Sequence, residues 1–128
     1  MSGEGPILDW TSGELAEGLR CYRSGQFFEA HEHWELVWLK SGEPEKTLLQ
    51  GLIQMTAAFH HFQRGNLQGA ASLLKQAGQK LEGFVNVPGQ ISMASLCAEI
   101  GAWLKALEAN DASKLAFPRI DVRRESSD

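Results

Sequence analysis

Apolar residues recur at helical spacing through most of the chain, in five blocks separated by short segments rich in glycine, proline and polar residues. The blocks predict helices over residues 11–24, 26–40, 43–64, 66–84 and 91–108. No stretch alternates apolar and polar residues long enough to indicate a sheet. The pattern therefore predicts an all-α fold.

Glycine corners divide the first four blocks into two pairs. Arg23-Ser24-Gly25 followed by Ala30 is echoed 40 residues later by Gln63-Arg64-Gly65 followed by Ala70. Each corner predicts a helical hairpin, since glycine favours the C-terminal end of a helix. We expect a compact bundle of about five helices, built from two antiparallel hairpins plus a C-terminal helix, rather than an open solenoid.

The segments outside the five blocks complete the expected domain, a single unit over residues 1–128. Residues 1–9 read as a loose lead-in, after which Thr11 or Ser12 would cap the first helix, with Glu14 reaching back to Thr11. Phe117-Pro118 and Ile120 are expected to dock on the bundle as an extended segment. The tail, residues 122–128, is expected to be disordered.

The second block places titratable side chains in an aromatic stripe. On a helix, one side of residues 26–40 collects Phe27, Phe28, His31, Trp34, Glu35, Trp38 and Leu39. His31 and Glu35 lie one turn apart within it. A buried charge is costly unless it is paired, hydrogen-bonded or bound to a metal. This stripe is therefore the first candidate for a functional site.

The third block supplies residues that could face this pair. Gln50 and His60 can approach it from a neighbouring helix, and Glu32 lies at the edge of the stripe. The candidate cluster is then His31, Glu32, Glu35, Gln50 and His60. In the favoured hypothesis these residues form a buried hydrogen-bond network that fixes the register of the two helices. The protein would then have a binding or scaffold role, working as a homodimer or through a protein partner.

The alternative hypothesis turns the same residues into a pocket for a divalent metal ion or a small ligand. His31, Glu35 and His60 would be the metal ligands, and Glu32 or Glu35 could serve as a general base in a hydrolase. The string from His31 to Glu35 is not a zincin motif, because HExxH requires a second histidine where Glu35 stands. Whether the protein is an enzyme stays open at this point.

Composition narrows the class of partner. The 128 residues carry a formal net charge of -4 and 22% charged residues, which argues against general nucleic-acid binding. No apolar run approaches the ~20 residues of a membrane span. The two cysteines, Cys21 and Cys97, show no paired spacing, and the N-terminus lacks the pattern of a signal peptide. We therefore expect a cytoplasmic protein that binds neither nucleic acid nor membrane.

Several of these residues together resemble the signature of a known family. Phe28-Glu29-Ala30-His31-Glu32, then Glu35 and Trp38, then Gln50-Gly51-Leu52-Ile53 and His60, are similar to the pattern of domain of unknown function 309. The resemblance runs from about Leu15 to Leu81. It implies a small, helical, prokaryotic, cytoplasmic protein, with His31, Glu32, Glu35, Gln50 and His60 as characteristic polar positions. It implies no reaction.

Overall fold

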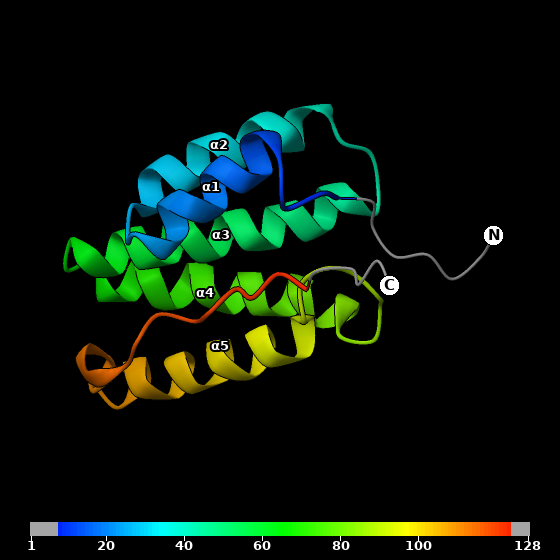
Figure 1. Cartoon of the computed structure of the whole chain (residues 1–128). Helices are drawn as coiled ribbons and strands as arrows, with labels where there is room; N and C mark the ends of the chain where they lie inside the picture. The colour runs from blue at the N-terminus through cyan, green and yellow to red at the C-terminus, as the bar shows by residue number, and fades with distance from the viewer. Residues whose placement is uncertain (1–7, 124–128) are drawn as a thin grey trace.

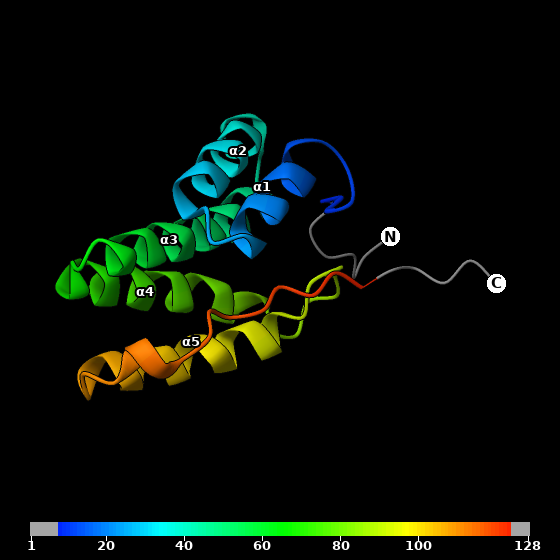
Figure 2. The same ribbon diagram turned by 60° about the vertical axis from the view of Figure 1, so that its left-hand side comes forward.

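The computed structural model describes residues 8–123, which fold into five α-helices and two short 3-10 helices. The elements are α1 (Gly13–Arg23), α2 (Phe27–Lys40), α3 (Glu45–Gln63), α4 (Leu67–Leu81), η1 (Glu82–Phe84), α5 (Met93–Glu108) and η2 (Ala112–Lys114). The hairpin of α1 and α2 lies on α3, with α4 and α5 following below (Figure 1; Figure 2). The predicted all-α bundle of two hairpins and a C-terminal helix is confirmed.

Three of these helices, α1, α3 and α5, end in the same type of turn. Gly25, Gly65 and Asn110 have positive φ values of 78°, 83° and 58°. At each corner the next N–H reaches five residues back, from Gln26 to Cys21 (2.8 Å), Asn66 to His61 (2.9 Å) and Asp111 to Ala106 (2.7 Å). These bonds define a Schellman motif, in which a left-handed residue satisfies the last carbonyls of a helix. Helices α2 and α4 follow the first two corners, whereas the third leads only into η2.

The two hairpins are equivalent at an offset of 40 residues. Buried positions recur at this offset, as Leu15 and Met55, Leu19 and Phe59, Ala30 and Ala70, and Trp34 and Leu74. The echo in the sequence therefore reflects a structural repeat. Position by position, α2 corresponds to α4.

The start of α1 differs from its predicted cap. The Ser12 side chain makes no capping bond to the helix. Instead the Asp9 carboxylate accepts hydrogen bonds from Thr11 N, Thr11 Oγ1 and Ser12 Oγ, at 3.0, 2.5 and 3.0 Å. The Thr11 side chain is the main cause that holds the pKa of Asp9 below its ordinary value. Glu14 does not turn back towards Thr11 but pairs with His33 Nδ1 of α2, at 2.5 Å.

The chain after η2 returns as an extended segment against α1, α3 and α5, as predicted. Phe117 packs on Trp103 and Phe59, with ring centroids 5.3 and 5.1 Å apart. Tyr22 Oη donates to the carbonyl of Pro118 (2.7 Å), and burial raises the pKa of this phenol. Ile120 is buried. Side chains of the helices thus bind both the ring and the backbone of this segment.

The two ends of the chain were expected to be loose. Val122 forms an isolated antiparallel bridge with Ile91, and Arg123 N donates to the carbonyl of Gln90 at 2.6 Å. The expected disorder is therefore wrong at these two residues. The rest of the expected tail, 124–128, and residues 1–7 of the lead-in lie outside the described part of the chain. Within residues 8–123, no strand forms, and no helix is both long and apolar enough to cross a membrane.

Candidate functional site

Helices α2 and α3 run antiparallel and form one seam. The Phe28 ring lies 5.6 Å from the His60 ring at one end, and Lys46 Nζ lies 4.2 Å from the centre of the Trp38 ring at the other. Along the helices, His31 and Glu35 of α2 and the middle of α3 lie between these two contacts. The five residues of the predicted cluster therefore lie on neighbouring helices, spread along a line.

The predicted burial of the carboxylates is wrong. Glu32 and Glu35 are exposed, while His31, Gln50 and His60 are half-buried. The inner face of α2 is formed by Phe27, Ala30 and Trp34, and it points between α1 and α3. Projection of the sequence alone placed Phe28, Glu35 and Leu39 on that face, but the helix is rotated so that all three face outward.

The five side chains do not form a hydrogen-bonded network. No two of them are joined by a hydrogen bond within residues 8–123. Instead, the His31 and His60 rings both lie near Phe28, with centroids 6.3 and 5.6 Å from the phenyl ring. The polar cluster of the sequence is thus a row of separate side chains beside an aromatic contact.

The structure does not bring the predicted metal ligands together either. Across the described residues, no group of three or more His, Cys, Asp or Glu side chains is placed to hold a metal ion. As the structure places them, His31, Glu35 and His60 are therefore not a ready three-ligand set.

Buried polar atoms without partners occur along this part of the molecule. His31 Nδ1, Trp38 Nε1 and Gln54 Oε1 are buried and accept or donate no hydrogen bond within residues 8–123. The indoles of Trp34 and Trp103, by contrast, donate to the carbonyls of Leu15 (3.1 Å) and Ala116 (2.9 Å). Buried polar groups are normally paired. The helix pair α2 and α3 is therefore where polar satisfaction is least complete.

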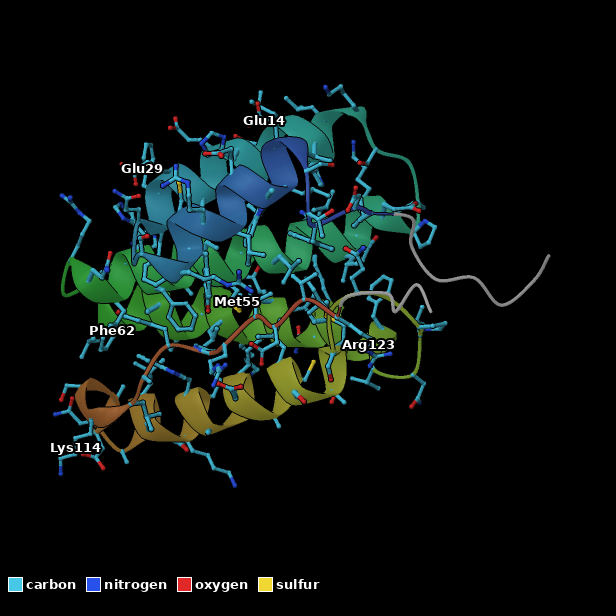
Figure 3. All side chains as sticks on the ribbon, viewed as in Figure 1. Glu14, Glu29, Met55, Phe62, Lys114 and Arg123 are labelled. Atoms are coloured by element: carbon cyan, nitrogen blue, oxygen red, sulfur yellow. The ribbon has the colours of Figure 1, made fainter. Side chains whose placement is uncertain are left out.

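The outward face of α2 carries most of the exposed large apolar side chains of residues 8–123. Its apolar side chains Phe28, Leu36 and Leu39 are 50%, 49% and 62% exposed. Glu29, Glu32 and Glu35 lie among them, and Figure 3 shows Glu29 on the outer side of the helix. We call these six residues the α2 face. A shallow hollow of about 550 Å³ extends it past Phe28 to Gln63 and Arg64 at the end of α3.

The repeat provides an internal reference for this face. At the offset of 40 residues, Phe28, Leu36 and Leu39 correspond to Gln68, Gln76 and Gln79 on α4. All three glutamines are exposed. The same outward positions are thus apolar on α2 and polar on α4. Sequence reasoning missed the α2 face, although comparison of the two hairpins at this offset could have found it.

Comparison with known proteins finds a family similarity over the first four helices. Residues 15–73, from α1 into α4, match the family model described as Domain of unknown function (DUF309). An uncharacterized protein of Aquifex aeolicus (strain VF5) is 37% identical over 92 residues, which are 71% of this chain and 26% of that protein. The chain thus spans about a quarter of this relative's length. The family match and the shared motifs agree with the fold, and residues 15–73 are similar to the domain of unknown function 309 family, as the sequence motifs predicted.

Proposed function

We propose that this chain is a protein-binding domain whose contact surface is the α2 face. The observation that carries the proposal is the contrast between Phe28, Leu36 and Leu39 and the glutamines at the equivalent positions of α4. The fold itself does not require apolar residues there, since α4 keeps the same place with polar ones. Apolar side chains gathered on one exposed face are typical of an interaction site.

The energetics suit binding of moderate strength. Complete burial of a Leu or Phe side chain stabilises by about 1.5–3 kcal/mol, and these three are already about half buried. Covering them would therefore contribute roughly 1 kcal/mol each, before polar contacts are counted. Such a surface gives binding without a large obligate interface.

The polar cluster has a supporting part in this proposal. The rings of His31 and His60 both lie near the Phe28 ring, at one end of the α2 face. Glu32 and Glu35 belong to the face itself. The greater length of the relative also supports a binding module, because there the matched region is one part of a larger protein.

Site-specific photo-crosslinking in cells tests the proposal. A photoreactive amino acid is placed at Leu36 or Leu39 in the full chain, and in matched controls at Gln76 or Gln79. We expect one defined crosslinked protein, identified by mass spectrometry, from positions 36 and 39 only. Its yield should fall when Phe28→Gln is added.

Equal crosslinking from α2 and α4, or an unchanged yield of the crosslinked product after Phe28→Gln, would contradict the proposal. Melting temperatures of all variants are measured in parallel. Because positions 28, 36 and 39 are exposed, the melting temperature of each variant should differ from that of the wild type by no more than a few degrees.

A further inference from the structure

The carboxylates of the α2 face have no partners of their own. Glu29, Glu32 and Glu35 form neither ion pairs nor side-chain hydrogen bonds with any of residues 8–123. Along the helix they lie between Phe28 at one end and Leu36 and Leu39 at the other. We infer that the occupant of this face is a basic amphipathic helix of a partner protein, an inference that rests on the proposed function.

The spacing of the face fits a helix as its partner. Phe28, Glu32, Glu35 and Leu39 follow one another at intervals of four, three and four residues, which places them in one row along α2. Apolar anchors stand at the two ends of this row and acidic groups in its middle. An amphipathic helix offers a matching row, since it presents anchors at i, i+3 or i+4, and i+7.

The middle of the neighbouring helix adds no charge beside this row. Its partly accessible side chains here are the half-buried Gln50, Gln54 and Ala57 of α3. They carry no charge, and alanine allows a close approach. A partner helix lying over the seam would therefore meet acidic groups only from α2.

The positive charges around the face lie at its two ends, which limits where a partner can carry positive charge. Lys40 and Lys46 lie at its Leu39 end, and Lys46 is engaged with the ring and carbonyl of Trp38. Arg64 lies in the hollow beyond Phe28. Positive charges of the partner are thus best placed at its centre, against Glu32 and Glu35.

A second copy of the chain fits this face poorly. In an antiparallel pairing about a two-fold axis, Phe28 of one copy meets Leu39 of the other only if Glu32 meets Glu35 across the axis. Four carboxylates would then gather at the centre of the interface, where like charges repel. Anionic surfaces such as nucleic acids and acidic lipids are disfavoured for the same reason.

Helix α4 again shows that the charge is not a property of the repeat. At the offset of 40 residues, Glu29, Glu32 and Glu35 correspond to Gly69, Ser72 and Lys75. The acidic row and the apolar anchors therefore occur together on α2 and are both missing from α4. This coincidence of two independent features favours one ligand that uses both.

Two defined peptides test the inference on the full chain. Both are 18-residue amphipathic helices with leucine on one face, and the other face is lysine in one and glutamate in the other. Binding is measured by fluorescence anisotropy at about 50 mM salt. We expect the lysine peptide to bind and the glutamate peptide not to, and the affinity to fall at about 500 mM salt.

Three variants separate the inference from the proposed function. Glu32→Gln with Glu35→Gln should weaken binding of the lysine peptide about tenfold or more. Phe28→Gln with Leu36→Gln and Leu39→Gln should abolish it. Leu67→Gln with Leu115→Gln, which changes exposed apolar residues elsewhere, should leave it unchanged.

Each other outcome decides against the basic partner helix, the α2 face as a contact surface, or both. If the charge variant binds equally well, or the glutamate peptide binds equally, the partner is not basic, although loss in the glutamine triple variant still supports the α2 face. A dimer in sedimentation equilibrium that this triple variant dissociates makes a second copy the occupant and overturns the inference. Absence of peptide binding in a monomeric chain, or unchanged binding by the triple variant, overturns both.

Discussion

Helices α2 and α4 occupy equivalent places in two successive hairpins, yet they differ in what they present to solvent. Their inner positions follow the same plan, with Ala30 and Trp34 on one helix and Ala70 and Leu74 on the other. Their outward positions do not. The phenylalanine and leucines of α2 correspond to glutamines on α4, and its glutamates correspond to glycine, serine and lysine. Packing constrains the first set in both hairpins. The second set is free to differ, and this difference is the basis of the proposed contact surface.

The hairpins also differ in the size of the side chains at one pair of equivalent inner positions. An indole, Trp34, fills the first hairpin and donates to the carbonyl of Leu15 at 3.1 Å. It lies against Gly18, where a Cβ atom would be 2.3 Å from Trp34 Nε1. The equivalent pair in the second hairpin is Leu74 and Ala58, both fully buried. The larger side chain therefore requires the smaller neighbour.

The largest effect is expected from Gly18→Ala. The new methyl group overlaps the indole of Trp34, which is fully buried and packed on Trp10 with ring centroids 5.5 Å apart. We expect a loss of about 3 kcal/mol in the free energy of unfolding, at the upper end of overpacking effects. In a Trp34→Leu background, which copies the second hairpin, the same change should cost less than about 1 kcal/mol.

Denaturation with guanidinium chloride measures this double-mutant cycle. Gly101→Ala on α5 is the matched control, because a Cβ atom there meets nothing within 4 Å. That change should be neutral or stabilise by up to about 1 kcal/mol. An equal cost of Gly18→Ala in both backgrounds would show that the indole is not what requires the glycine.

The corners of the two hairpins should respond alike. Gly25→Ala and Gly65→Ala each place a Cβ atom on a residue with φ near +80°. Left-handed backbone costs about 1–2 kcal/mol in a non-glycine residue, so each variant should lose about that much stability, and the two losses should agree within about 0.5 kcal/mol. Chemical denaturation of both variants checks this. A clear difference between them would weaken the equivalence of the hairpins.

The starts of α2 and α4 should respond differently. The Asn66 side chain caps α4 by accepting from Gly69 N at 2.9 Å, whereas Gln26 makes no such bond on α2. Loss of a capping side chain costs about 1 kcal/mol. We expect Asn66→Ala to lose that amount and Gln26→Ala to stay within about 0.5 kcal/mol of the wild type, both by thermal and chemical denaturation. If Asn66→Ala instead stays within about 0.5 kcal/mol of the wild type, the Asn66 bond does not stabilise the helix.

Much of the fold follows from sequence because its signals are local. Glycine at positions 25 and 65 marks the corners, and apolar spacing of 3.6 residues marks the helices. The approach of Gly18 to Trp34 is not local, since it depends on how two helices meet. Asp9 likewise binds the turn that precedes α1, and it lies outside the pattern that predicts the helix.

The candidate site is harder to predict for a related reason. Apolar residues cover more than half the circumference of α2, so periodicity alone does not say which part faces the core. The true inner face is set by the directions of α1 and α3, and it leaves Phe28, Glu35 and Leu39 outside. The sequence does point to α2, because the family signature shares Phe28, Glu29, Glu32 and Glu35 with the α2 face. It does not reveal that the carboxylates are exposed.

The smallest effect on stability is expected from Glu35→Ala, and it addresses that exposure directly. A buried, hydrogen-bonded Glu35 would cost about 2–4 kcal/mol on removal, because its partners would be left unpaired. The side chain is instead exposed and has no hydrogen-bond partner within residues 8–123, so the free energy of unfolding should change by less than about 0.5 kcal/mol. Lys75→Ala, at the equivalent position of α4, should change it equally little. The two variants should differ in binding alone, because only Glu35 lies on the α2 face. A loss above 2 kcal/mol for Glu35→Ala would restore the buried network and place the carboxylate inside the seam.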